Sequence, residues 1–375
     1  MKYYIIAGEA SGDMYGALLV KALKQKDSSA EFRFWGGDAM VAEAGQPVRH
    51  IRELAIMGFV EVAVHLRTVL GNIKFCKHDI VQYQPDVVIG IDYPGFNLRI
   101  ERWAKEQGFK TVHYISPNLW AWKKGRIKGM RRSLDRLCYI LPFEKDFFAE
   151  NDMPQAVYVG HPLLDQIKIG NTGSEFGLAK DKPIIALLPG SRRQELNNSM
   201  PLMTALARKH PEYRFVVAGM SLIDKDLYRR LTGDGSGIEI VYDKTYALLS
   251  EAYAAVVCSG TATLETAMFD VPQVVCYRAN PISIAIAKAI VSKRINYISL
   301  VNLIADSPIV TELIQGDFNV ERLENEFDRI TVDDDNRERI KNEYADMRML
   351  LGGGGASERT ADIIMELIAK HSDTK

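Results

Sequence analysis

Short runs of β-branched and aromatic residues alternate with segments of helical length along the whole chain. Runs such as Val87–Ile91 are apolar at every position, which is typical of a parallel strand covered by helices on both faces. The alternation predicts a doubly wound α/β architecture. We expect strands at Lys2–Ala7, Phe32–Gly36, Val87–Ile91, Lys110–Ile115, Arg136–Leu141, Ala156–Gly160, Ile184–Leu188, Tyr213–Ala218, Ile238–Tyr242, Ala254–Cys258 and Gln273–Tyr277.

The segment Gln166–Pro183 interrupts this pattern with glycine, polar residues and a charged Lys-Asp-Lys-Pro sequence, so it is the expected linker. It divides the chain into domains at 1–165 and 166–350. Two Rossmann-like halves with a ligand between them are the simplest geometry. After the glycine run that ends at Ala356, Ser357 is expected to cap a last helix over about 356–370.

Composition narrows the class of protein. The chain has 375 residues, 47% of them hydrophobic, and a formal net charge of -1, which gives no overall preference for nucleic acid. Its four cysteines have neither CxxC nor zinc-ligand spacing, and Cys138, Cys258 and Cys276 lie in apolar runs, so we expect buried thiols in a reducing compartment. No metal site, signal peptide or spanning helix is expected, and the protein is expected to stay inside the cell.

Ligands of open α/β sheets bind beyond the carboxyl ends of the strands. Gly8–Asp13 follows the first strand and opens a helix, where glycines allow close backbone approach and the helix N-terminus favours oxygen-rich groups. The alternative is a tight turn capped by Ser11 or Asp13. In Gly90–Asn97, Asp92 ends the most apolar strand, where a carboxylate suits a general base. The alternative there is a helix cap.

Two loops of the second half suit a nucleotide. Leu187–Glu195 holds a Gly-Ser-Arg turn whose N–H groups, hydroxyl and guanidinium match a diphosphate, although it lacks the lysine and spacing of a P-loop. A plain surface turn is the alternative. Cys258–Glu265 offers small hydroxyl residues before a helix, and Glu265 is placed to accept both hydroxyls of a ribose. Helix capping by Ser259 or Thr261 is compatible with that role.

The stretch Ser116–Arg132 contains six cations and two tryptophans with no acidic residue. Such residues suit the headgroup layer of an anionic membrane, while nucleic-acid binding and a solvated face are the alternatives. Ala55–Arg67 is very apolar, and the sequence leaves open whether this segment belongs to the core or forms a surface that receives acyl chains. The expected membrane-docking residues are Trp120, Trp122, Lys123, Lys124, Arg126, Lys128, Arg131 and Arg132.

Taken together, these segments resemble the lipid-A-disaccharide synthase family over essentially the whole chain. The matching pieces are GEASGD at 8–13, MGFVEV at 57–62, GIDYPGFN at 90–97, SPNLWAWKKGR at 116–126, VGHPLLD at 159–165, LLPGSR at 187–192, SGTATLE at 259–265 and VNLIAD at 301–306. The resemblance implies an α/β GT-B fold, that is, two Rossmann-like domains facing a cleft, with the last helix crossing back to the first domain. It also implies UDP-2,3-diacylglucosamine as donor, lipid X as acceptor, and peripheral association with the cytoplasmic face of the inner membrane.

The same resemblance implies roles for single residues. Asp92 is the candidate base, Glu9 also faces the acceptor, and Arg192 stabilises the leaving diphosphate, with no cofactor or metal required. Asn302 is the softest assignment, because Val301 stands where the family has proline. The substrate-binding set is Ser11, Gly12, Asn97, Gly190, Ser191, Gly260, Thr261, Thr263, Glu265 and Asn302.

Two rival functions remain at this point. Another GT-B enzyme such as a UDP-GlcNAc 2-epimerase would share the UDP site, but would not need the stretch of tryptophan and cations. A non-catalytic protein that binds UDP-sugar or lipid would not need to retain Glu9, Asp92, Arg192 and Glu265 together. A nucleic-acid-binding protein would need a recognisable module, and the sequence has none. Whether the chain forms a homo-oligomer is left open.

Overall fold

The chain folds into two compact units in a computed structural model that describes residues 1–54, 66–117, 119, 125–169, 182–233, 236–278 and 296–372. Unit 1 comprises residues 1–169 together with 353–375, and unit 2 comprises residues 170–352. The expected boundary at 165/166 lies inside a helix of unit 1, so the division comes four residues later than the composition suggested.

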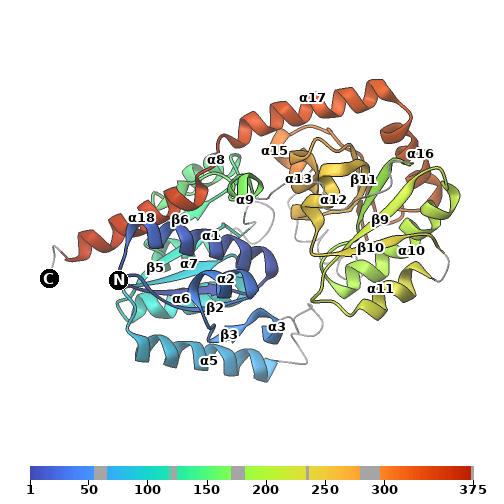
Figure 1. The fold of residues 1–375 in the computed structure, drawn as a ribbon. Coiled ribbons are helices and arrows are strands. Elements are labelled where there is room, and N and C mark those ends of the chain that lie inside the picture. Colours follow the sequence, from blue (N-terminus) through green and yellow to red (C-terminus); the bar gives the residue numbers. More distant parts are fainter. Residues whose placement is uncertain are drawn as a thin grey trace. The chain divides into compact units, whose positions relative to one another are not determined.

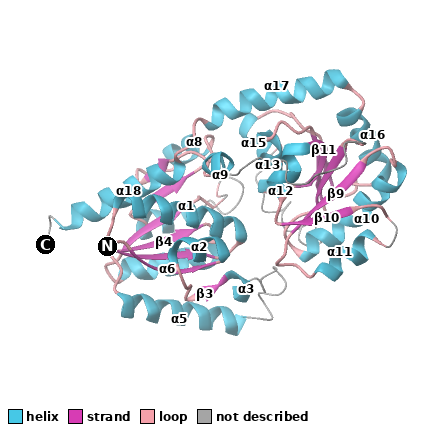
Figure 2. Cartoon of the chain, in the orientation of Figure 1, coloured by secondary structure: helices cyan, strands magenta, loops and turns pink. Residues whose placement is uncertain are grey.

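Unit 1 is built on a seven-stranded parallel sheet of order β3-β2-β1-β4-β5-β6-β7 (Figures 1 and 2). Its elements are β1 (Lys2–Ala7), α1 (Ala10–Lys26), β2 (Glu31–Gly36), α2 (Asp38–Ala44), β3 (Arg49–His50), α3 (Ile51–Leu54), α5 (Leu66–Tyr83), β4 (Val87–Ile91), α6 (Pro94–Glu106), β5 (Lys110–Tyr114), α7 (Arg126–Ser133), β6 (Arg136–Tyr139), α8 (Glu144–Glu150), β7 (Ala156–Tyr158), α9 (Leu163–Ile169) and α18 (Ala356–Ser372).

Both faces of this sheet are covered, which explains why its central strands are apolar throughout. Tyr4, Ile6 and Val88 pack against α5 and α6 on one face. On the other face α18 lies along α1 and contacts β5 (Figure 1), and the hydroxyl of Tyr3 reaches the sulfur of Met365 in α18. Each fully buried aliphatic side chain contributes about 1.5–3 kcal/mol of transfer free energy. The last helix therefore completes the core of unit 1, as the sequence predicted.

The start of α18 corrects one detail of the prediction. The helix begins at Ala356, so Ser357 lies inside it and the expectation of a Ser357 cap is wrong. The N–H groups of Gly355 and Ser357 instead donate to the carboxylate of Asp165, which belongs to α9. Arg359 adds a hydrogen bond from its Nε to the carbonyl of Val159, at 2.8 Å. The VGHPLLD segment thus holds the last helix in place.

Unit 2 repeats the architecture with a six-stranded parallel sheet of order β10-β9-β8-β11-β12-β13. Its elements are β8 (Ile184–Leu188), α10 (Arg193–Lys209), β9 (Arg214–Gly219), α11 (Lys225–Thr232), β10 (Glu239–Tyr242), α12 (Thr245–Glu251), β11 (Ala252–Cys258), α13 (Thr261–Met268), β12 (Gln273–Tyr277), α15 (Leu300–Ala305), β13 (Glu312–Ile314), α16 (Val320–Thr331) and α17 (Asp334–Leu351).

Each sheet has one point at which the strand order reverses, and that point is where ligands of such sheets bind. In unit 1 it lies between β1 and β4, and in unit 2 it lies between β8 and β11. The loops that follow these four strands are the four loops that the sequence singled out for ligand binding. Topology therefore gathers the predicted residues of these four loops into one group in each unit.

Candidate functional site

In unit 1 the loops after β1 and β4 leave the same edge of the sheet, because Ala7 lies opposite Ile91 in the register of these strands. The two loops are in contact: a Cβ atom on Gly8 would overlap the ring of Tyr93. Burial and the charge of Glu9 raise the pKa of Tyr93 to about 12. Glu9, two residues after β1, and Asp92, one residue after β4, are thereby brought to one edge.

The backbone around Asp92 is strained. Asp92 has a φ of 45°, Tyr93 a φ of 50°, and Ile115, at the end of the neighbouring β5, a φ of 71°. Positive φ in a β-branched residue is rare and explains why β5 ends at Tyr114 rather than at Ile115 as expected. Conformations of this kind cost about 1–3 kcal/mol each and collect at functional sites. They identify the carboxyl ends of β4 and β5 as the candidate site of unit 1.

Asn97 anchors this strained turn. Its side-chain amide donates to the carbonyl of Asp92 at 2.7 Å and also approaches the carbonyls of Ile6 (3.2 Å) and Ile91 (3.3 Å). The N–H of Asp92 is held by the carbonyl of Tyr114 at 2.9 Å. Asn97 is fully buried, so in this structure it orients Asp92 rather than presenting its amide to solvent.

The first turn of α1 holds the other predicted residues of unit 1. Glu9 is at the N-cap position, and Ser11 and Gly12 follow inside the helix. Asp13 does not cap its own helix, as one alternative proposed: its carboxylate accepts the N–H groups of Gly37, Ala39 and Met40 at 2.6, 3.0 and 3.1 Å. Asp13 therefore caps α2, and Asp92 is no cap either, since Tyr93 is the N-cap residue of α6.

One pair beside this site was missed by the sequence reasoning. His113 on β5 and Glu101 on α6 are both fully buried, and the His113 Nδ1 lies 2.7 Å from the Glu101 Oε1. Within the part of the chain that the structure describes, His113 Nε2 and Glu101 Oε2 have no hydrogen-bond partner. Leaving such atoms unpaired costs about 1–3 kcal/mol each. The only available signal was a histidine in an apolar strand.

In unit 2 the turn between β8 and α10 already binds a carboxylate. The N–H groups of Ser191 and Arg192 donate to the Glu195 Oε2, at 2.9 and 3.2 Å. Gly190 has a φ of 107°, and a Cβ there would overlap the side chain of Glu195. The guanidinium of Arg192 is exposed and lies 3.4 Å from the same carboxylate. The turn is thus a place where backbone N–H groups hold an anionic group.

The loop between β11 and α13 lies beside this turn, because β8 and β11 pair in the sheet. Gly260 is the N-cap residue of α13, so neither Ser259 nor Thr261 caps it. Ser259 instead donates its hydroxyl to the carbonyl of Ile298, at 3.1 Å, and the buried Thr263 donates to the carbonyl of Gly260, at 2.8 Å. Among the hydroxyl residues of the predicted set, Thr261 remains partly exposed at the helix start.

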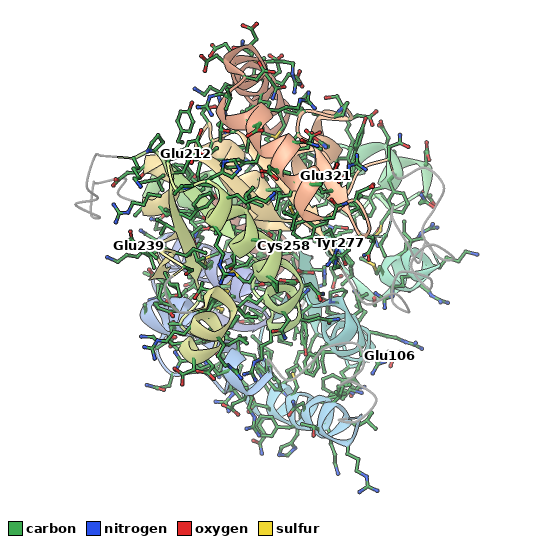
Figure 3. All side chains as sticks on the ribbon, turned by 90° about the vertical axis from the view of Figure 1, so that its right-hand side faces the viewer. Glu106, Glu212, Glu239, Cys258, Tyr277 and Glu321 are labelled. Atoms are coloured by element: carbon green, nitrogen blue, oxygen red, sulfur yellow. The ribbon has the colours of Figure 1, made fainter. Side chains whose placement is uncertain are left out.

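Cys258 and Tyr277, which end β11 and β12, lie together at this edge (Figure 3). Burial raises the pKa of Cys258 to about 12; the charge of Glu195 adds to this effect and the charge of Arg192 opposes it. All four cysteines of the chain are buried free thiols, as the sequence predicted for Cys138, Cys258 and Cys276.

Glu265 accepts a hydrogen bond from a residue of α12. The hydroxyl of Tyr246 donates to the Glu265 Oε1 at 3.1 Å, and the Tyr246 ring packs on Phe269 with 5.5 Å between ring centroids. Burial raises the pKa of Glu265, partly offset by the Tyr246 hydrogen bond. Tyr246, which the sequence reasoning did not single out, therefore orients the predicted ribose-binding carboxylate.

The side chain of Asn302 makes structural hydrogen bonds within unit 2. Its amide nitrogen donates to the carbonyl of Val310 (2.9 Å) and to Glu312 (3.0 Å), and its oxygen accepts the N–H of Val310 (3.0 Å). Because the residue is buried and all these contacts are internal, Asn302 ties α15 to β13. A direct contact with a donor sugar would require these bonds to break.

The structure describes only part of the predicted membrane-docking stretch. Trp120, Trp122, Lys123 and Lys124 lie outside the described residues, as does most of Ala55–Arg67. The remaining cations belong to α7, which buries Ile127 and Met130. Lys128, Arg131 and Arg132 are exposed, and Arg126 is partly exposed.

Three further features concern ligands and membranes. Within the described ranges, no group of three or more His, Cys, Asp or Glu side chains is arranged to hold a metal ion. No helix among the same residues combines the length and the apolar character required to cross a bilayer. A surface cavity of about 330 Å³ lies between α15 and α17, lined by Pro308, Arg339 and Leu350 among others. It contains none of the predicted site residues, so the strand ends are the better candidate site.

Comparison with known proteins identifies the family. The family model described as lipid-A-disaccharide synthetase matches residues 3–366. The chain belongs to the lipid-A-disaccharide synthase family. A lipid-A-disaccharide synthase of Geobacter metallireducens is 35% identical over 375 residues, covering 98% of this chain and 97% of the relative. A synthase of Syntrophus aciditrophicus is 37% identical over 376 residues, with the same coverage. The predicted glycosyltransferase class is confirmed.

Solved structures confirm the fold. An S. aureus MnaA–UDP co-structure has a TM-score of 0.70 at 16% identity, covering 98% of this chain and 97% of its own. The UDP-GlcNAc 2-epimerase of Neisseria meningitidis bound to UDP-GlcNAc has a TM-score of 0.69 at 13% identity, covering 98% and 100%. At these identities the likeness shows the GT-B architecture alone. It does not favour the epimerase alternative over the synthase family.

Proposed function

We propose that this member of the lipid-A-disaccharide synthase family joins two acylated glucosamines. It transfers 2,3-diacylglucosamine from UDP-2,3-diacylglucosamine to 2,3-diacylglucosamine 1-phosphate, lipid X. The products are the β-1,6-linked disaccharide 1-phosphate and UDP. The observation that carries this proposal is the match to one family over residues 3–366, in a chain whose four candidate ligand-binding loops lie at the switch point of each sheet.

In this proposal Asp92 is the general base. It takes the proton from the 6-hydroxyl of the acceptor while that oxygen attacks the anomeric carbon opposite the leaving UDP, so that one displacement inverts the configuration. Support comes from the strained turn that holds Asp92 and from its position at the carboxyl edge of β4. General-base catalysis contributes about 10²–10⁴-fold to the rate of such reactions. Glu9, at the same edge, is the second carboxylate of the site.

Unit 2 binds the donor nucleotide in this proposal. The diphosphate replaces the Glu195 carboxylate on the N–H groups of Ser191 and Arg192, because these donors already hold an anion of similar chemistry. Arg192 then stabilises the charge that develops on the leaving group. Thr261 and Thr263 are placed near the phosphates, and Glu265, oriented by Tyr246, accepts the ribose hydroxyls.

The enzyme works at the cytoplasmic face of the inner membrane as a peripheral protein, since both substrates carry acyl chains and the acceptor carries a phosphate. The exposed cations of α7 support this proposal. Each cation near an anionic surface contributes about 1 kcal/mol to binding. The tryptophans of the preceding segment are expected to add interfacial anchoring.

The test is a mass-spectrometric assay of the purified protein with UDP-2,3-diacylglucosamine and lipid X in detergent micelles, with EDTA present. We expect UDP and a tetraacyl disaccharide 1-phosphate. If neither forms, with or without added magnesium, while UDP still binds, the synthase proposal is wrong and soluble UDP-sugars become the substrates to screen.

A pair of variants tests the base. Asp92→Asn should lower kcat about 10²–10⁴-fold. Asp270→Asn is the matched control, because Asp270 also has a positive φ (55°) but is exposed and precedes β12, at the opposite edge of a sheet. It should retain the full rate.

A further inference from the structure

A carboxylate of the protein itself occupies the turn in which the donor diphosphate is proposed to bind. Glu195, in the first turn of α10, folds back so that its Oε2 accepts the N–H groups of Ser191 (2.9 Å) and Arg192 (3.2 Å). These are the same donors that the proposed function assigns to the diphosphate. One anion therefore has to leave the turn before the other can enter it.

Helix capping accounts for only part of this arrangement. In a capping box, the side chain at the third helical position accepts the N–H group of the N-cap residue, which is Arg192 here. The second donor, the N–H group of Ser191, precedes the N-cap and is no part of the box. The carboxylate has room to reach it because residue 190 is glycine, whose φ is 107°: a Cβ there would overlap the side chain of Glu195. The turn is thus shaped around an anion that accepts two N–H groups.

The backbone of the turn is held by bonds that do not involve the Glu195 carboxylate. The hydroxyl of Ser199 lies 2.8 Å from the carbonyl oxygens of both Pro189 and Glu195, so it joins the two sides of the turn. The side chain of Glu195 is 23% exposed and therefore has a route to solvent. The carboxylate can rotate out of the turn while the N–H groups keep their positions.

The same rotation breaks an ion pair. The Arg192 Nη1 lies 3.4 Å from the Glu195 Oε1. A diphosphate that displaces the carboxylate from the N–H groups also takes over the guanidinium, so both kinds of donor pass from Glu195 to the ligand. Hydrogen bonds between such donors and an ionised acceptor are about twice as strong as neutral ones, so the exchange affects the affinity of the turn for any anion.

We propose that Glu195 is an internal competitor of the donor diphosphate: its carboxylate occupies the turn at Ser191 and Arg192, weakens the binding of UDP, and so speeds the release of UDP after transfer. This inference rests on the proposed role of the turn in binding the diphosphate. The apparent Kd of a ligand is its intrinsic Kd divided by the fraction of molecules in which the site is open. Occupancy of the turn by Glu195 in about nine molecules of ten raises the Kd for UDP about tenfold.

The experiment is calorimetry of UDP and of uridine with the full chain, for the wild type, Glu195→Ala and Glu195→Gln. Uridine carries no phosphate, so it does not compete with the carboxylate. Glu195→Ala should lower the Kd for UDP about tenfold and leave the Kd for uridine unchanged. Glu195→Gln keeps an acceptor oxygen for the helix cap but loses the charge, so its Kd for UDP should lie between those of the wild type and Glu195→Ala.

Two results overturn the proposal. One is a Kd for UDP that is unchanged or higher in both variants, because Glu195 would then act only as a cap or would assist binding. The other is an equal fall in the Kd for uridine, because the effect would then lie outside the diphosphate. If Glu195→Ala does not fold, Glu195→Gln decides by the same comparison of UDP with uridine.

Asp333→Ala is the matched control for the loss of a capping carboxylate. Asp333 is the exposed N-cap residue of α17, and its side chain accepts the N–H group of Asn336 at 3.0 Å. Two residues earlier, the carbonyl of Thr331 accepts the hydroxyl of Tyr253 near the start of β11, at the edge of the sheet opposite to the candidate site. The variant should lower the Tm and leave the Kd for UDP unchanged. A fall in this Kd equal to that in Glu195→Ala would show a general effect of charge and overturn the proposal.

Arg192→Ala separates failure of this inference from failure of the proposed function. If Arg192→Ala weakens the binding of UDP while neither Glu195 variant strengthens it, the diphosphate site stands and the competitor is wrong. If Arg192→Ala has no effect and the wild type binds UDP no more tightly than uridine, the turn does not bind a diphosphate, and the donor site in unit 2 fails together with the role of Glu195. Product inhibition gives an independent readout: the Ki of UDP in the synthase assay should fall about tenfold in Glu195→Ala, and a wild-type Ki overturns the role in release.

Discussion

Replacing Glu144 by glutamine should stabilise unit 1 at neutral and alkaline pH. Glu144 is the first residue of α8, and only 1% of its surface is exposed. Burial raises the pKa of its carboxyl from 4.5 to about 8, against the opposing effect of hydrogen bonds from Ser116 and from the backbone of Leu141 and Ile140. The folded protein therefore holds the Glu144 proton at pH values at which the unfolded chain has lost it.

The sign and size of the effect follow from proton linkage. A carboxyl whose pKa is raised by folding contributes stability that is fully present below pH 4.5 and is lost as the pH rises towards 8. Each pH unit in this window costs about 1.4 kcal/mol, so the loss at pH 7 is about 3 kcal/mol. Glutamine has nearly the same shape and no charge, so Glu144→Gln should gain less than about 1 kcal/mol over the wild type at pH 5 and about 3 kcal/mol at pH 7.

Urea unfolding followed by tryptophan fluorescence measures this difference in unit 1 alone, because all four tryptophans fall within residues 1–169. Glu150→Gln is the matched control, since Glu150 lies on the same helix but is exposed, and it should show no pH-dependent gain. A gain for Glu144→Gln that is the same at pH 5 and pH 8 would refute the reasoning, because it would show that the Glu144 carboxyl does not titrate differently on folding.

Three further outcomes are expected. Asp165→Ala removes the carboxylate that accepts the first N–H groups of α18, and should lower the unfolding free energy of unit 1 by about 1–2 kcal/mol in the same fluorescence assay. Tyr246→Phe leaves Glu265 without its hydrogen bond and should raise the Kd for UDP about fivefold by calorimetry, whereas an unchanged Kd would separate Glu265 from the nucleotide. Changing the three exposed cations of α7 to glutamine should weaken sedimentation with anionic vesicles about 100-fold, and equal binding to neutral vesicles would exclude a charge contribution.

Hydrophobic pattern alone was sufficient for eleven of the thirteen strands that the structure describes in the two sheets. Four of them, Lys2–Ala7, Val87–Ile91, Ile184–Leu188 and Gln273–Tyr277, have the predicted bounds, because a strand buried on both faces leaves an uninterrupted apolar run. The edge strands β3 and β13 were missed. They contain two and three residues, which is too short for a periodic signal.

For the candidate site too, some features could be predicted from the sequence and others could not. The residues after β1, β4, β8 and β11 could be found from the sequence, since the end of an apolar strand followed by glycine and polar residues is a local pattern. Their grouping into two pairs of loops follows from the sheet order. The family was also within reach of the sequence, because eight short segments in one order are more specific than any one of them.

What the tertiary structure alone decided is the set of partners that each polar side chain bonds. Asp13 caps α2 rather than α1, and Asp165 caps a helix 190 residues further along the chain. Asn302 is hydrogen-bonded to the backbone before β13 instead of facing outward. The His113–Glu101 pair exists because β5 and α6 pack over Gly90. Apolar burial is non-directional and leaves a periodic trace in the sequence, whereas a hydrogen bond joins two atoms whose proximity is set by folding.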